Sequence, residues 1–138
     1  MTNDLVSDML TRIRNASLAR HSIVRVCYSK LNLSILKVLQ NENYISEFHI
    51  EDEIKSIKSI KIILKYKGWW IKKPLFSTIK RISKPGNRVF SGYKNFQKII
   101  DVLRYDQGTA IISTSNGVMS HLKATKLKKG GEILCFIG

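Results

Sequence analysis

The sequence predicts a protein that combines helices and strands in two halves packed against each other. Apolar residues recur at helical spacing near the N-terminus and alternate with lysines further along the chain. The chain has 138 residues, of which 43% are hydrophobic, so it can bury a core and is not expected to be disordered. No long Gly/Ser linker is present, and we place the division after residue 68, where Gly68-Trp69-Trp70 leads into Lys72-Lys73-Pro74.

The first half, residues 1–68, is expected to fold as helix, strand, helix and two strands. Asn3 or Asp4 can cap the first helix, because short polar side chains accept hydrogen bonds from free N–H groups there. Glu51-Asp52-Glu53 is expected to be a solvated acidic turn. The expected elements are a helix with an apolar face from Leu5 to Ala16, a strand at 23–26, a helix from about Ser29 or Leu31 to Gln40, and strands at 44–50 and 60–66.

The second half, residues 69–138, is expected to be rich in strands and to contain a short helix. Lys84-Pro85-Gly86-Asn87 is a strong turn signal, and Ser120 is a suitable cap for a helix that reaches about Lys128 before Gly130-Gly131 stops it. Strands are expected at 78–83, 88–90, 110–112 and 132–137, a polar turn at 113–117, and core positions at Phe96, Ile99, Ile100, Val102 and Leu103.

The charge of the chain points to a polyanionic partner. The formal net charge is +14, and residues 69–138 hold 13 Lys and Arg against three acids. Nucleic acid is therefore the first candidate, and an anionic membrane surface is the second, although such binding usually needs a basic amphipathic helix. The apolar runs are too short to span a bilayer, so no membrane partner is expected.

Several basic side chains are candidates for contacts with phosphate. Those of the second half are Lys80, Arg81, Lys84 and Arg88 around the Pro-Gly turn, Lys72 and Lys73 at the junction, and Lys126, Lys128 and Lys129 at the end of the last helix. Arg12 and Arg14 on the first helix are further candidates. The alternatives are solvated arginines on the first helix and, for the last cluster, lysines that favour the negative end of a helix dipole.

The polar turn Ser113-Thr114-Ser115-Asn116-Gly117 carries small hydrogen-bonding groups that suit RNA phosphates, 2′-hydroxyls and base edges. Serine and threonine also favour turns for purely local reasons, which is the alternative. Glu132 either accepts a hydrogen bond from a base or a lysine, or fixes a backbone N–H inside the protein. Phe90, Tyr93 and Trp69 either stack on bases or belong to the core.

Catalysis, metal binding and cofactor binding are not expected. Ser113 or Ser115 with His121 could form a hydrolase site, but no GxSxG elbow surrounds them, and the chain has no P-loop or GxGxxG. Cys27 and Cys135 lie in apolar runs without zinc-binding spacing, so we expect two buried free thiols and a reducing compartment.

Three ordered blocks of the sequence carry a family resemblance. The end, AIISTSNGVM…KLKKGGEILCFI, the middle, IKRISKPGNRVF, and the start, DLVSDMLTRIRNA, resemble the bacterial-type small ribosomal subunit protein eight family. The resemblance implies a two-part α+β protein, with an α/β N-terminal subdomain at 1–68 and a β-rich C-terminal subdomain at 69–138. It further implies direct binding to an irregular helix in the central domain of small-subunit rRNA, support of subunit assembly, neighbouring ribosomal proteins as partners, and no homo-oligomer.

The resemblance also assigns RNA contacts to residues of this chain. They are Ser113, Thr114, Ser115, Gly117 and Glu132, a second edge with Lys84, Pro85, Gly86 and Phe90, and Arg12, Arg14 and Asn15 on the first helix. Two departures stand out: Ser120-His121-Leu122-Lys123-Ala124 replaces the usual Thr-Asp-Arg-Glu-Ala, and Phe90 replaces the usual tyrosine. With an Ile-, Lys- and Asn-rich composition, they suggest a divergent organellar member, and we expect a mitochondrial ribosome, with plastid and bacterial ribosomes as alternatives. A general nucleic-acid binder outside the ribosome is the other hypothesis.

Overall fold

The computed structural model describes residues 5–52, 58–68, 73–76, 78–102 and 108–138. The chain divides into two compact units, Met1–Phe76 and Ser77–Gly138, and each is described by itself. The expected cap at Asn3 or Asp4, the pair Trp69-Trp70 and Leu103 lie outside the described residues. The boundary expected after residue 68 adjoins residues 69–72, which are also outside them, and it stays a prediction.

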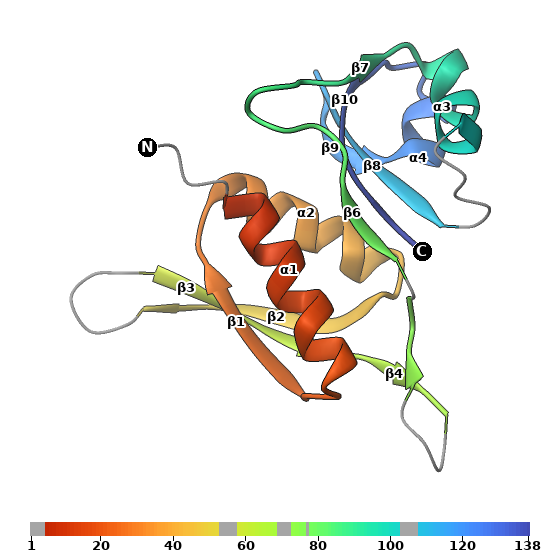
Figure 1. Ribbon diagram of the computed structural model, residues 1–138. Coiled ribbons are helices and arrows are strands. Elements are labelled where there is room, and N and C mark those ends of the chain that lie inside the picture. Colours follow the sequence, from red (N-terminus) through yellow and green to blue (C-terminus); the bar gives the residue numbers. More distant parts are fainter. Residues whose placement is uncertain (1–4, 53–57, 69–72, 77, 103–107) are drawn as a thin grey trace. The chain divides into compact units, whose positions relative to one another are not determined.

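The first unit is a three-stranded antiparallel sheet with two helices on one face (Figure 1). Its elements are α1 Leu5–Leu18, β1 Ile23–Cys27, α2 Lys30–Asn41, β2 Ile45–Asp52 and β3 Lys58–Leu64, followed by a small pair of strands, β4 Tyr66–Lys67 and β5 Lys73–Pro74. The strand order is β1-β3-β2. Side chains that alternate along β3, such as Ile60 and Ile62, are buried beneath the helices, as the period-two pattern predicted.

A buried asparagine connects three elements of the first unit. Ser29 caps α2, because its hydroxyl accepts a hydrogen bond from the backbone N–H of Asn32 (3.0 Å). The side-chain amide of Asn32 then donates to the carbonyls of Leu5 (3.3 Å) and Cys27 (3.1 Å). These bonds join the start of α2 to α1 and to the end of β1.

The structure corrects three expectations for the first unit. Glu51 and Asp52 belong to β2 rather than to a turn, and Glu51 forms an ion pair with Arg25 (3.2 Å). Cys27 is exposed, because β1 places its side chain on the sheet face that the helices leave open. Tyr66 lies in β4 rather than at the end of β3, and its hydroxyl donates to the carbonyl of His21.

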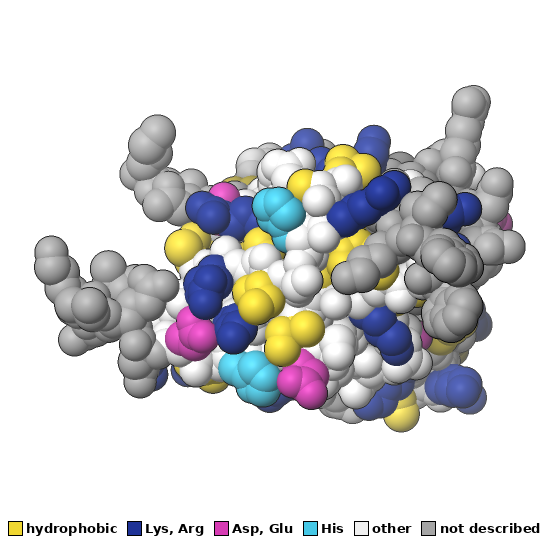
Figure 2. All heavy atoms as spheres, turned by 90° about the horizontal axis from the view of Figure 1, so that it is seen from below, with side chains coloured by type: hydrophobic (Ala, Val, Ile, Leu, Met, Phe, Trp, Pro, Cys, Tyr) yellow, Lys and Arg dark blue, Asp and Glu magenta, His cyan; other side chains and the backbone are white. Residues whose placement is uncertain are grey.

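The open sheet face of the first unit has mixed charge. The register places Arg25 of β1 beside Lys61 of β3, and Lys61 beside His49 of β2. Glu47 lies 3.1 Å from His49, and Glu51 pairs with Arg25. Figure 2 shows basic side chains interspersed with acidic, histidine and hydrophobic ones. The described residues of this face therefore do not form a continuous cationic surface.

The second unit is a five-stranded antiparallel sheet with short helices. Strands β6 Ile79–Arg81, β10 Gly131–Ile137, β8 Thr109–Thr114 and β9 Gly117–Ser120 follow in that order, and β7 Phe90–Ser91 also pairs with β10 (Figure 1). The helical segments are η1 Tyr93–Asn95, α3 Phe96–Val102 and α4 His121–Lys126. Residues 133–137 of β10 are all buried, and Phe96, Ile100 and Phe136 lie in the core cluster, as predicted for Phe96 and Ile100.

The signal for the Pro-Gly turn is confirmed, because Lys84 and Asn87 exchange both backbone hydrogen bonds (3.0 and 2.9 Å). Ser120 caps α4 by accepting from the N–H of Lys123 (3.2 Å), also as predicted. The expected end of this helix is wrong: α4 stops at Lys126. The N–H of Lys129 bonds to the carbonyl of Ala124 (2.9 Å), and Lys128 adopts a φ of 56°, so this left-handed cap ends the helix before the glycines.

Candidate nucleic-acid interface

Strand β10 brings three candidate residues from distant parts of the sequence into one row. Glu132 lies directly opposite Ser113 of β8 on one side and opposite Phe90 of β7 on the other. We call Ser113, Glu132 and Phe90 the cross-strand row. Phe90 is 67% exposed, so its ring belongs to the surface and not to the core. A flat exposed aromatic ring can stack on a nucleotide base.

The β8–β9 hairpin places the polar turn at one end of the cross-strand row. Ser115 and Asn116 are exposed at its tip, where strand pairing ends at Thr114 and Gly117. The hydroxyl of Thr114 donates to the carbonyl of Gly117 (2.8 Å) and accepts from the N–H of Asn116 (3.1 Å). Thr114 therefore shapes the turn, while Ser115 and Asn116 present their polar groups outward. Gly117 has a φ of +112°, a conformation that only glycine adopts without strain.

The carboxylate of Glu132 is held inside the protein. Its Oε1 atom accepts hydrogen bonds from the hydroxyl of Ser83 (2.8 Å) and from Nη1 of Arg88 (3.0 Å), and only 15% of its side chain is exposed. Of the two roles expected for Glu132, this arrangement is closer to a carboxylate that forms hydrogen bonds inside the protein, although its donors are side chains and not a backbone N–H. Glu132 thus connects β10 to both flanks of the Pro-Gly turn.

Ser83 is a structural member of this site that the sequence analysis missed. It is fully buried, and its hydroxyl also accepts from the backbone N–H of Val89 (3.2 Å). Ser83 and Val89 lie on opposite sides of the 84–87 turn, so one hydroxyl closes the loop that carries Arg88 and Phe90. A serine inside a basic stretch gives no sequence signal for this role, because its partners are Glu132 on the distant strand β10 and Val89, six residues further along the chain.

The basic candidates of the second unit differ in exposure. Lys80, Lys84, Arg88, Lys126 and Lys128 are exposed, and so are Pro85 and Gly86 at the turn, whereas Lys129 is half-buried.

Arg81 differs from these residues, because its Nε and Nη1 atoms are buried and because it lies opposite Cys135 of β10 in the sheet. Burial raises the pKa of the Cys135 thiol to about 12, although the charge of Arg81 acts in the opposite direction.

A glycine allows β10 to start close to β8. A Cβ atom on Gly131 would clash with the backbone carbonyl of Ser113, so only glycine fits there without a backbone shift. This close approach sets the spacing between Glu132 and the polar turn.

The candidates on α1 belong to the other unit. Arg12 forms an exposed ion pair with Asp8 (2.9 Å) one helical turn away, and Arg14 and Asn15 are also exposed. Within the second unit, the register therefore aligns Ser113, Glu132 and Phe90, whereas the α1 candidates belong to the first unit.

The catalytic alternative receives no geometric support. His121 is 5% exposed, and its Nδ1 atom accepts from the backbone N–H of Ala110 (3.1 Å), whereas Ser113 lies three residues further along β8 and Ser115 lies at the turn. Among the described residues, no group of three His, Cys, Asp or Glu side chains could hold a metal ion. None of the described helices combines the length and apolar character that a membrane crossing requires.

Comparison with known proteins is consistent across nearly the full length. Residues 4–137 match the family described as ribosomal protein S8. The chain is 51% identical over 137 residues to small ribosomal subunit protein uS8c of Gracilaria tenuistipitata var. liui, and 48% identical to that of Phaeodactylum tricornutum, with 99% of each chain covered. It is 46% identical to small ribosomal subunit protein uS8 of Trichormus variabilis, over 98% of this chain and 97% of that protein.

Proposed function

The chain belongs to the ribosomal protein S8 family and is a structural protein of the small ribosomal subunit, and we propose that its second unit binds small-subunit rRNA through the cross-strand row and the adjoining turns. The observation that supports this proposal most is the register that places Ser113, Glu132 and Phe90 side by side on three strands. The exposed ring of Phe90 lies at one end of this row, and the turn with the outward polar groups of Ser115 and Asn116 adjoins the other end.

Each group has a separate task in this proposal. The ring of Phe90 stacks on a base, and Ser115 and Asn116 hydrogen-bond to bases or 2′-hydroxyls at the tip of the hairpin. Lys80, Lys84, Arg88, Lys126, Lys128 and Lys129 neutralise phosphates. Glu132 and Ser83 position Arg88 and the 84–87 turn, because their hydrogen bonds connect that turn to β10.

The site on the ribosome is also part of the proposal. We place it at an irregular helix in the central domain of small-subunit rRNA, where binding would support subunit assembly and translation. Arg12, Arg14 and Asn15 on the exposed side of α1 would add contacts to RNA, and neighbouring ribosomal proteins would be further partners. We assign the protein a structural role without catalysis.

A plastid or bacterial ribosome is favoured over a mitochondrial one. The relatives named uS8c are plastid proteins, and the protein of Trichormus variabilis is bacterial. These similarities support a plastid or bacterial ribosome, the two alternatives of the sequence analysis, more than the mitochondrial ribosome that was expected first.

The experiment that tests the function compares matched serine variants. Ser115→Ala should weaken binding to a cognate rRNA fragment by about 1–3 kcal/mol, because it removes a hydrogen-bonding group at the interface. Ser46→Ala, at an exposed position of β2 in the first unit, is the control and should leave the affinity unchanged. Equal losses on unrelated RNA, or no loss on the cognate fragment, would contradict the proposal.

The alternative of a general nucleic-acid binder predicts a different result in cells. A ribosomal protein should sediment with small subunits after a high-salt wash, because specific contacts persist when phosphate contacts are screened. A general binder of polyanions should be released by the same wash.

A further inference from the structure

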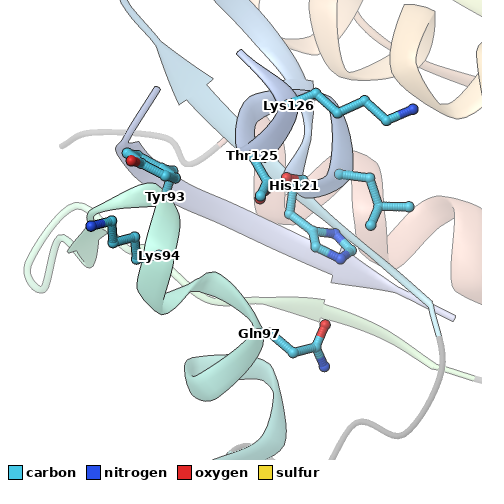
Figure 3. A pocket seen from close by; sticks show the side chains of 7 residues that line it. Tyr93, Lys94, Gln97, His121, Thr125 and Lys126 are labelled. Atoms are coloured by element: carbon cyan, nitrogen blue, oxygen red, sulfur yellow. Dashed lines mark hydrogen bonds between the residues drawn. The ribbon is translucent and has the colours of Figure 1, made fainter. Parts of the chain in front are cut away.

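A groove on the second unit lies between α4 and the η1–α3 segment, and of its lining the function proposed above uses only Lys126. Its volume is about 520 Å³. Tyr93, Lys94 and Gln97 line one wall, and His121, Leu122 and Lys126 line the other (Figure 3).

The two walls are fixed by the core beneath them. Phe96 of α3 and Ala124 of α4 are both buried in the same core cluster, and Tyr93 packs against it. At the start of α4, Nδ1 of His121 accepts from the N–H of Ala110 (3.1 Å), and the hydroxyl of Thr125 donates to the carbonyl of His121 (2.7 Å). The groove is therefore a preformed feature of the fold.

The lining combines an apolar surface with positive charge. The side chain of Leu122 is 56% exposed. Covering it with a ligand would lower the free energy, because it would remove apolar surface from water. Lys94 and Lys126 come from opposite walls, as Figure 3 shows, and no acid is among the described residues that line the groove. The nearby carboxylate of Asp101 accepts a hydrogen bond from the amide of Gln97 (2.9 Å).

We propose that this groove holds one unstacked nucleotide of RNA, with its base against Tyr93 and Leu122 and its flanking phosphates at Lys94 and Lys126. The inference rests on the proposed rRNA binding. A nucleotide within a chain has a phosphate on each side of its base, which matches an apolar groove with an ammonium group on each wall. Aromatic and apolar side chains are the usual contacts for bases that leave the stack. An acidic peptide would satisfy the lysines, but it would not supply a flat apolar group between its charges.

Two leucine variants of similar exposure test the inference. Leu122→Ala should weaken binding to the cognate rRNA fragment about five- to tenfold, because it removes apolar contact with the base. Leu127→Ala removes an exposed leucine that does not line the groove, and its affinity should stay within about twofold of the wild type. Circular-dichroism melting of both variants checks that the fold is retained.

Ultraviolet cross-linking of the wild-type complex supplies an independent measurement. Mass spectrometry should find a nucleotide attached to the peptide that contains Tyr93, and Leu122→Ala should reduce this product. No cross-link at the groove, or equal affinities for the two leucine variants, would overturn the inference.

If Ser115→Ala weakens binding and Leu122→Ala does not, the inference about the groove is wrong and the proposed function stands. If neither variant weakens binding, both the inference and the proposed function are wrong. A loss of a neighbouring protein from reconstituted subunits, with rRNA affinity unchanged, would make the groove a protein contact and also overturn the inference.

Discussion

The hydrogen bond between Ser83 and Glu132 is the contact in the second unit whose removal has the most readily calculated effect. Ser83 is fully buried, and its hydroxyl donates to a carboxylate that is mostly buried (2.8 Å). A hydrogen bond to a charged group contributes about 1.5–3 kcal/mol to stability. The ion pair of the same oxygen with Arg88 adds at most about 1 kcal/mol, because half of the Arg88 side chain is exposed.

These values predict the outcome of a double-mutant cycle. Ser83→Ala should lower the free energy of unfolding by about 2–4 kcal/mol, because it also leaves the backbone N–H of Val89 without its acceptor. Glu132→Gln keeps the shape and loses the charge, so it should cost about 1–2 kcal/mol. The coupling energy between the two positions should be about 1–2 kcal/mol, as expected for residues in direct contact.

Urea unfolding followed by circular dichroism measures these free energies. Glu47→Gln is the matched control, because Glu47 is an exposed carboxylate whose ion pair with His49 lies at the surface; it should change stability by less than about 0.5 kcal/mol. Glu132→Gln should also weaken rRNA binding, because the Pro-Gly turn loses its support, with little change in salt dependence, because Arg88 and the lysines keep their charges. A coupling energy near zero would refute the positioning role of Glu132.

Three further predictions follow from the described contacts. Lys80→Ala or Lys129→Ala should reduce the slope of log affinity against log salt concentration by about one unit in binding titrations, because each removes one phosphate contact; an unchanged slope would remove that lysine from the interface. Arg20→Gly should raise the free energy of unfolding by about 0.5–1 kcal/mol in urea titrations, because Arg20 follows the end of α1 with a φ of 60° that glycine adopts more easily; a loss of stability would contradict this. Exposed Cys27 should react with a thiol reagent in the native protein, whereas buried Cys135 should react only after unfolding. Above pH 9.0 the unfolded state releases the Cys135 proton, whereas the native state, in which the thiol has a pKa of about 12, retains it. The free energy of unfolding should therefore fall with rising pH up to about pH 12, by up to about 1.4 kcal/mol per pH unit, and Cys135→Ala should lack this dependence.

Local signals predicted the elements that depend on neighbouring residues. Ser120 caps its helix as a short hydroxyl side chain does, and the Lys-Pro-Gly-Asn sequence closes its turn through the backbone hydrogen bonds between Lys84 and Asn87. The end of α4 was placed too late, because a left-handed conformation was expected at glycine and occurs at Lys128. Nothing in the sequence around Lys128 indicates that it would adopt this conformation.

The features that the sequence could not provide are those set by long-range pairing. The polar turn and Glu132 stood out by composition, but only the register of β10 shows that Glu132 lies between Ser113 and Phe90. Ser83 was missed because its partners are distant, and Cys27 was placed on the wrong face because an apolar run does not reveal which side of a sheet is covered. The family resemblance indicated candidate residues. The structure separates those that are exposed, such as Ser115 and Asn116, from Glu132, whose hydrogen bonds position its neighbours.

A structure of the small ribosomal subunit that contains this protein is the most direct test of the central claim. The account predicts that the ring of Phe90 contacts an rRNA base and that Ser115 or Asn116 lies within hydrogen-bonding distance of rRNA, while Glu132 remains bonded to Ser83. A subunit structure in which Phe90 and residues 113–117 face away from all rRNA would contradict the account.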